Sequence, residues 1–166
     1  MRNVFKHLSY SLFFTFLFAV QSAPDSFWLG VKPNITLLFV LSMSILEGTG
    51  SGITYAVICG AALDALGYPI FGINALLMAY FALLCSYSYA SFFSYSYAVG
   101  SLFVGTVSVA YQFIFYFITY FIWGGKHTLS ALYEVILPEA LYNVIFAFLV
   151  FFVMVKIYLR FERMRT

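Results

Sequence analysis

An aspartate lies in an apolar stretch of the sequence, where a carboxylate is costly to place. Asp64 ends the run Gly60-Ala-Ala-Leu-Asp64, and a charged side chain within a membrane helix costs roughly 2.5 to 3.5 kcal/mol on insertion scales. Such an acid can relay protons, bind an ion or make a polar packing contact. No Lys or Arg lies at a similar depth to pair with it. A hydrogen bond that caps the loop at residues 67–74 or a neighbouring helix is therefore preferred, ahead of partner contact and of transport or catalysis.

The other acids and one amide have simpler expected roles. Glu47, Glu134 and Glu139 fall at the ends of predicted membrane spans, where a solvated acid at the interface is the expectation. Asn143 lies in the middle of the last predicted span, and its amide needs hydrogen-bond partners in lipid. We expect Asn143 to bond to a neighbouring helix.

Metal and cofactor sites are not expected. His7 and His127 fall on opposite flanks of the predicted bundle, too far apart to share a metal ion. Cys59 and Cys85 lie in apolar stretches without CxxC spacing, which is typical of buried small side chains.

Two broad classes of function are excluded by what the sequence lacks. It contains no Ser/His/Asp or Cys/His constellation, no HExxH motif and no phosphate-binding loop, so we expect no enzymatic activity. The formal net charge is only +2, and no Lys/Arg cluster is interleaved with aromatic residues. Nucleic acid is therefore not an expected partner.

The composition indicates an integral membrane protein. Hydrophobic residues make up 64% of the chain and charged residues 8%, whereas soluble domains carry about 25% charged residues. Every backbone polar group must be paired within lipid, and long continuous apolar runs select helices rather than a barrel. We expect a single all-α transmembrane domain over residues 1–166, in contact with membrane lipid.

The apolar runs predict six membrane-spanning helices. Residues 73–123 contain no charged side chain, and a single helix of that length would measure about 77 Å, so this run must fold back near residues 94–100. The serine- and tyrosine-rich tract at 86–97 is expected to be helical, because an isolated strand cannot satisfy its backbone in lipid. Residues 131–137 are expected to form a short interfacial helix. The six spans are 4–20, 34–46, 51–66, 73 to about 94, 99–123 and 139–155.

Prolines and charges add detail to this topology. Pro33 and Pro138 are each expected to open a helix in its first turn. The span at 34–46 is short, which implies local thinning of the bilayer or a half-buried hairpin with the next span. Six of the eight basic residues lie near the two termini, so the positive-inside rule places both termini in the cytoplasm.

Small residues form a stripe on the third predicted span. Gly52, Ala56, Gly60 and Asp64 are four residues apart, so they share one face of a helix. Side chains this small let a neighbouring backbone approach closely. We expect this helix to be the packing spine of the bundle.

Three short motifs resemble one membrane-protein family. They are Lys32-Pro33-Asn34 at the start of a helix, Gly60-Ala-Ala-Leu-Asp64 followed by Gly72-Ile-Asn74, and Leu137-Pro138-Glu-Ala-Leu-Tyr-Asn143 before a basic tail. In their order and spacing they resemble MreD, the rod-shape-determining membrane protein of bacteria.

The resemblance implies a function and a fold. It implies a non-enzymatic inner-membrane component of the cell-elongation machinery that binds MreC and, through it, MreB filaments, RodA and a class B penicillin-binding protein. It also implies a fold similar to the six-helix substrate-binding component of energy-coupling-factor vitamin transporters. The alternative function is such a vitamin-binding subunit, with Asp64 and the 67–74 loop lining the pocket.

Overall fold

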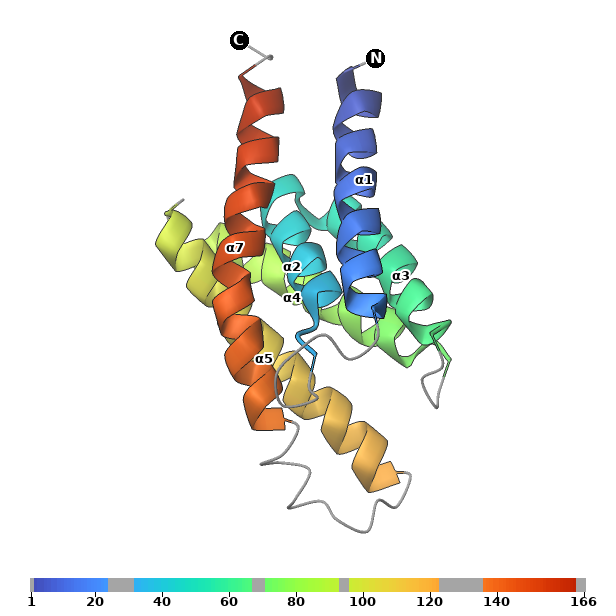
Figure 1. Cartoon of the computed structure of the whole chain (residues 1–166). Coiled ribbons are helices and arrows are strands. Elements are labelled where there is room, and N and C mark those ends of the chain that lie inside the picture. Colours follow the sequence, from blue (N-terminus) through green and yellow to red (C-terminus); the bar gives the residue numbers. More distant parts are fainter. Residues whose placement is uncertain (1, 24–31, 67–70, 93–95, 123–135, 164–166) are drawn as a thin grey trace.

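The computed structural model describes residues 2–23, 32–66, 71–92, 96–122 and 136–163. Within these ranges every regular element is a helix, which confirms the expected all-α class. The helices pack as a bundle in which α2 lies inside the others (Figure 1). Their bounds are α1 Arg2–Ser22, α2 Ile35–Glu47, α3 Thr49–Asp64, α4 Ile73–Phe92, α5 Tyr97–Ile122 and α7 Leu137–Glu162.

The short helix α2 is the centre of the bundle. Every residue from Ile35 to Ile45 is buried, and α2 contacts α1, α3, α4, α5 and α7. A helix that is apolar on all sides is stable where other helices cover all of it. Its 13 residues measure about 20 Å, less than the roughly 30 Å hydrocarbon core. Because protein rather than lipid surrounds α2, its length does not have to match the bilayer, and it is fully rather than half buried.

A tight turn joins α2 to α3. Gly48 caps the start of α3 with φ +83°, a backbone conformation that glycine adopts without strain. One turn later, a Cβ atom on Gly52 would lie 2.8 Å from Cα of Ser44 on α2. The two backbones are in contact there, so Gly52 leaves no room for a side chain.

The other end of the same stripe packs against α4. A Cβ atom on Gly60 would lie 2.6 Å from the backbone nitrogen of Ala75. Ala56, between the two glycines, is completely buried. The expected close approach is therefore present, but it involves two neighbours, because Gly52 faces α2 and Gly60 faces α4.

Helix α4 uses its own small residues against the hairpin of α2 and α3. The Ser44 hydroxyl donates to the carbonyl oxygen of Ala82, and the hydroxyls of Thr49 and Ser86 lie 3.0 Å apart. Residues 86–92 of the serine- and tyrosine-rich tract continue α4, so the helical prediction for this part is right. Residues 93–95 lie outside the described part of the chain.

Helices α5 and α7 form a second close pair. A Cβ atom on Gly105 would sit 3.5 Å from Cα of Val144, and one on Gly100 would meet the ring of Phe151. The small N-terminal half of α5 therefore accommodates the bulky side chains of α7. Ser108, which is fully buried, satisfies its hydroxyl within its own helix by donating to the Gly105 carbonyl.

Two expectations about helix ends need correction. Pro33 does not lie in the first turn of α2, because Asn34 is the N-cap residue and Pro33 precedes it. An Asn side chain can accept a backbone N–H bond, which makes it the better cap. Helix α7 is longer than the predicted span at 139–155, and Pro138 does lie in its first turn. The interfacial helix expected at 131–137 falls mostly outside the described residues.

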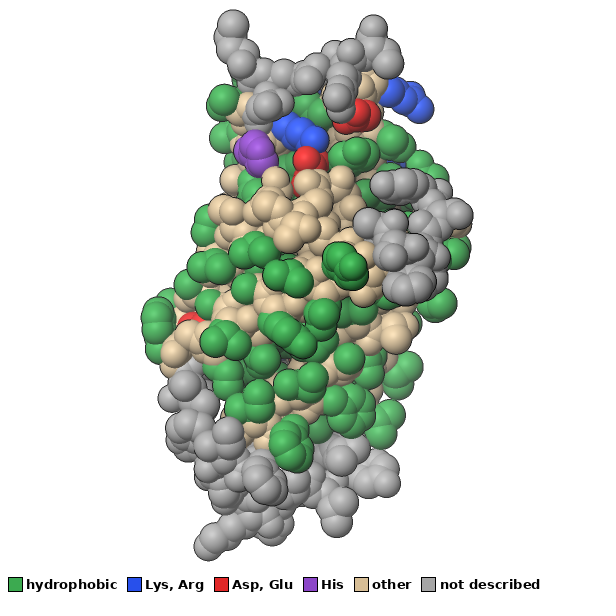
Figure 2. All heavy atoms as spheres, turned by 180° about the vertical axis from the view of Figure 1, so that it is seen from behind, with side chains coloured by type: hydrophobic (Ala, Val, Ile, Leu, Met, Phe, Trp, Pro, Cys, Tyr) green, Lys and Arg blue, Asp and Glu red, His purple; other side chains and the backbone are tan. Residues whose placement is uncertain are grey.

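The surface is divided into a charged end and an apolar belt. The first turns of α1 and the last turns of α7 lie at the same end of the bundle (Figure 1). Figure 2 shows that most charged side chains on that face gather at this end, with a broad hydrophobic surface below them. Exposed apolar residues such as Leu12, Phe16, Phe117 and Ile145 contribute to the belt.

Two helices in the described part of the chain are long and apolar enough to cross a membrane. They are α7 and the segment Tyr97–Thr119 of α5. The six-span topology stays a prediction.

The glycines predict which bulky substitutions the bundle tolerates. Gly60→Leu places a side chain on the α4 backbone, and overpacking of this kind typically costs 1–3 kcal/mol or more. Gly50→Leu is the matched control, because nothing lies within 4 Å of its Cβ position. We expect Gly60→Leu to lower the thermal unfolding temperature in detergent strongly, Asp64→Asn to lower it less, and Gly50→Leu to leave it unchanged. Equal effects of the two glycine variants would contradict this packing.

Candidate functional site

Asp64 caps the start of α4 from a different helix. One carboxylate oxygen accepts from the backbone nitrogen of Asn74 at 3.2 Å and from its side-chain Nδ2 at 2.9 Å. The other accepts from the backbone nitrogen of Ala75 at 3.2 Å. The first N–H groups of a helix have no partner within the helix, and its positive end favours an anion. Three N–H donors therefore hold the buried carboxyl group of Asp64, and no Lys or Arg of the described residues pairs with it.

The preceding turn allows this cap to form. Gly72 has φ +96° and lies immediately before α4, where a side chain would strain the backbone. Asn74 extends the cap to a third helix, because its Oδ1 accepts from the hydroxyl of Tyr111 on α5 at 2.8 Å. Asp64, Asn74 and Tyr111 are all buried. We call these three residues the aspartate cluster.

A second polar group centres on Asn143 of α7. Its Oδ1 accepts from the backbone nitrogen of Asn34 at 2.8 Å, across 109 positions of sequence. Its Nδ2 donates to Oε1 of Gln112 on α5 at 3.3 Å. Asn143 is fully buried, and it connects the start of α2 with α5 and α7. We call Asn34, Gln112 and Asn143 the amide cluster.

The last turn of α1 joins the amide cluster. Oε1 of Gln21 accepts from both the backbone nitrogen and the hydroxyl of Thr36, at 2.9 and 2.7 Å. Asn34 caps α2 by accepting from the backbone nitrogen of Leu37 at 3.1 Å. Nearby, Nζ of Lys32 donates to the carbonyl oxygen of Ala23 at 2.5 Å. The start of α2 is thus held by side chains from α1 and α7.

Two neighbouring residues of α5 link the clusters. Tyr111 belongs to the aspartate cluster and Gln112 belongs to the amide cluster. Neither Tyr111 nor Gln112 was among the site residues expected from the sequence. One signal was available, since Gln112 is the only Asn or Gln between residues 75 and 142, and a side-chain amide in a membrane helix needs a partner.

Glu139 lies beside the amide cluster in the first turn of α7. Its Oε2 accepts from the hydroxyl of Tyr116 at 2.8 Å, and the residue is half-buried. Glu139 also interacts with the side chain of Gln112. Nε2 of Gln112 makes no hydrogen bond of good geometry within the described residues. The solvated interface role expected for Glu139 is therefore wrong. Glu134 lies outside the described residues.

A third polar group lies at the opposite end of α2. Glu47 pairs with Nζ of Lys6, with oxygen–nitrogen distances of 2.6 and 2.8 Å, and accepts from the hydroxyl of Tyr10 at 2.7 Å. The Glu47 side chain is only 11% exposed, so the expectation of a solvated acid is wrong here too. This pair fastens α1 to the end of α2.

The predicted site residues therefore fall into groups with separate contacts. Asp64, Gly72 and Asn74 come together, as do Asn34 and Asn143. Gly52, Ala56 and Gly60 line helix contacts, Pro33 is buried beside Asn34, and Pro138 begins the helix that carries Asn143.

The chemistry available in the described residues is helix-to-helix hydrogen bonding. They contain no group of three or more His, Cys, Asp and Glu that could hold a metal ion. Cys59 and Cys85 are buried free thiols. His7 stacks on Tyr55, while His127 is outside the described part, so the expectation about a shared metal site is not addressed.

Comparison with known proteins identifies the family. Residues 1–161 match the family described as rod shape-determining protein MreD. The chain belongs to the MreD family. No curated protein and no solved structure matches it. Membership of the MreD family gives the protein a place in the membrane and a role in determining rod shape.

The amide cluster predicts a measurable loss of stability. Asn143→Leu leaves the backbone nitrogen of Asn34 and Oε1 of Gln112 without their partner, and an unsatisfied buried polar group costs about 1–3 kcal/mol. We expect a lower thermal unfolding temperature in detergent. Thr106→Val is the control, because Thr106 is exposed and its hydroxyl bonds only to Leu102 of its own helix. A control shift as large as that of Asn143→Leu would show that the cluster does not hold the helices.

Proposed function

We propose that this MreD-family protein is a non-enzymatic inner-membrane scaffold of the bacterial cell-elongation complex. It binds MreC directly and reaches MreB, RodA and a class B penicillin-binding protein through it, so that it contributes to peptidoglycan synthesis and cell shape. The family match over residues 1–161 carries the proposal. The structure supports it, because the buried polar side chains of the described residues are used mainly in bonds between helices.

The proposed topology has six spans with both termini in the cytoplasm and a fold similar to the substrate-binding component of energy-coupling-factor transporters. The shared end of α1 and α7 and the basic residues there support it (Figure 1). Lys32 and Arg160 mark opposite ends of this arrangement.

Cysteine labelling in whole cells tests the topology. A membrane-impermeant maleimide should label Lys32→Cys from outside the inner membrane and label Arg160→Cys only after permeabilisation. Native Cys59 and Cys85 are buried and give little background. Labelling of Arg160→Cys in intact cells would refute cytoplasmic termini.

The groove between α1 and α3 is the face we assign to a helix of MreC. It has a volume of about 540 Å³, and His7 of α1 stacks on Tyr55 of α3 at one of its edges. Gly50, Thr54 and Ile58 are one turn apart along its α3 wall, and Ser11 and Phe14 belong to α1. Gly50 differs from Gly52 and Gly60 because, in the described part of the chain, no neighbouring helix lies within 4 Å of its Cβ position. A small exposed residue in a membrane helix permits close approach by a helix from another chain.

Copurification tests this surface. Gly50→Leu fills the groove without disturbing the bundle, so we expect it to fold normally, to lose MreC during affinity purification and to give rounded cells when it replaces the native protein. Thr106→Leu, an exposed small residue of α5, is the control and should retain MreC. Retention of MreC by Gly50→Leu would move the contact to another face. Normal cell shape after depletion, together with no MreC association of the native protein, would reject the scaffold itself.

The alternative function is a substrate-binding subunit of an energy-coupling-factor vitamin transporter. One observation favours it: the polar side chains of Gln21, Asn34, Gln112 and Asn143 converge at one end of the bundle. This function predicts a bound vitamin that survives purification, or association with an ATPase module.

A further inference from the structure

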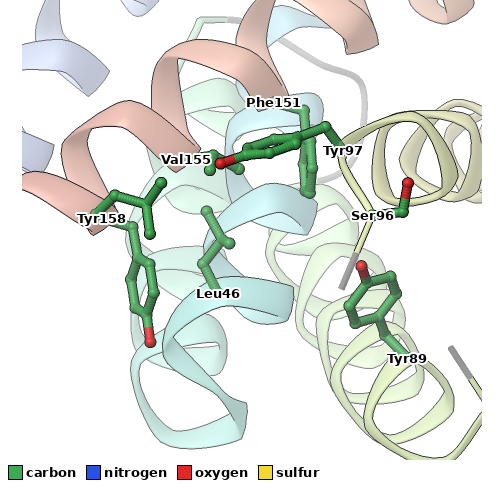
Figure 3. A pocket seen from close by; sticks show the side chains of 8 residues that line it. Leu46, Tyr89, Ser96, Tyr97, Phe151, Val155 and Tyr158 are labelled. Carbon is green, nitrogen blue, oxygen red and sulfur yellow. The ribbon is translucent and has the colours of Figure 1, made fainter. Parts of the chain in front are cut away.

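A hollow opens between the end of α4 and the C-terminal half of α7. It has a volume of about 260 Å³ and is lined mostly by apolar atoms, with tyrosine rings from α4, α5 and α7. Figure 3 shows the ring of Tyr97 extending from α5 toward α7, beside Phe151 and near Val155. Leu46 lines the hollow and precedes Glu47, which pairs with Lys6. The hollow therefore lies close to the charged end of the bundle.

A second hollow continues from the first along the outer face of α5 and α7. It measures about 590 Å³ and shares Tyr97 and Phe151 with the first. Its α7 wall is formed by apolar residues that are all exposed except the buried Phe151, and Ala98 and Ser101 of α5 form the other side. The α7 residues are Ile145, Phe148, Leu149, Phe151 and Phe152. Together the two hollows make one apolar groove, which we call the α5–α7 groove.

Two cations continue the groove toward the charged end. Phe152, Lys156 and Arg160 are four residues apart on α7, so they lie on one side of the helix. Nζ of Lys156 is 4.4 Å from the centre of the Phe152 ring, which itself lines the groove. Lys156 and Arg160 are both exposed. The apolar surface therefore ends directly at a basic rim.

The other described charges near this rim are mixed in sign. Lys6 lies 4.9 Å from the centre of the Tyr158 ring, on the wall of the first hollow, and it is paired with Glu47. Glu162 and Arg163 follow on the next turn of α7. The four cations Lys6, Lys156, Arg160 and Arg163 outnumber the two acids Glu47 and Glu162, so the formal charge of these six side chains is +2.

The length of the groove indicates what it holds. From Lys156 to Ile145 is about 16 Å along α7, close to half of the roughly 30 Å hydrocarbon core. An acyl chain anchored by its headgroup needs only one leaflet.

We infer that the α5–α7 groove binds an anionic phospholipid from the leaflet at the charged end. The phosphate lies between Lys156 and Arg160, and an acyl chain follows Phe152, Leu149 and Ile145 toward the centre of the bilayer. Basic residues beside an apolar gap between membrane helices are suited to anionic headgroups. The site is distinct from the α1–α3 groove assigned to MreC.

Native mass spectrometry of the full chain in mild detergent tests the site. Phosphatidylglycerol and phosphatidylcholine with identical acyl chains are added separately, and we expect phosphatidylglycerol to be retained preferentially. The double variant Lys156→Gln/Arg160→Gln should bind phosphatidylglycerol roughly 30-fold more weakly. This factor corresponds to about 1 kcal/mol of binding free energy lost for each of the two cations. Its binding of phosphatidylcholine should not change. Lys32→Gln removes a cation at the other end of the bundle and should behave like the native chain.

A second variant tests the acyl part of the groove without changing charge. Ala98 is exposed and lines the groove, so Ala98→Trp fills it from the surface. We expect an unchanged unfolding temperature and loss of the retained lipid. Equal retention of the two lipids by the native chain would overturn the inference, as would unchanged retention of phosphatidylglycerol by either variant. Displacement of the lipid by MreC, one for one, would identify the groove as a protein-binding face instead. Because lipid retention by the native chain and its variants is measured without MreC, its outcome is independent of the scaffold function.

Discussion

The structure depends on satisfying helix ends that begin inside the protein. Helices α2 and α4 both start among other helices, where water cannot pair their first N–H groups. Asn34 caps α2 from its own chain segment, and Asp64 caps α4 from the end of α3. An unpaired backbone group in such a place costs several kcal/mol. These caps therefore decide where the two helices can begin and which neighbours they must have.

The position of the caps explains why α2 can be short. Its start is held by Gln21 of α1 and Asn143 of α7, and its end by the pair of Glu47 with Lys6. Because both ends are fixed by other helices, α2 needs no further turn to reach the membrane surface. Its middle is apolar apart from the buried Ser42 and Ser44, so it is stable at the centre of the bundle. The positions of the surrounding helices are then set by their contacts with α2.

Much of this arrangement could be predicted from local sequence. The apolar runs, the fold-back between residues 73 and 123 and the small-residue stripe are properties of single helices, and each can be read from spacing. Asn34 and Asn143 are 109 positions apart, and the local sequence around either residue does not predict that they form a hydrogen bond. Glu47 was expected to be solvated because it lies at a helix end. Whether such an acid meets water or Lys6 depends on the packing of α1, which no local pattern contains.

The glycines show how one residue type serves two different surfaces. The backbones of α2 and α4 occupy the space beside Gly52 and Gly60, so neither position has room for a side chain. Gly50, on the same helix, faces the α1–α3 groove, and no other described helix lies within 4 Å of its Cβ position. Small residues thus build the bundle on one side of α3 and leave a close-approach surface on the other. The α5–α7 groove differs from that surface because bulky apolar side chains line it and two cations end it. The two surfaces proposed for a partner helix and for a lipid are therefore chemically distinct.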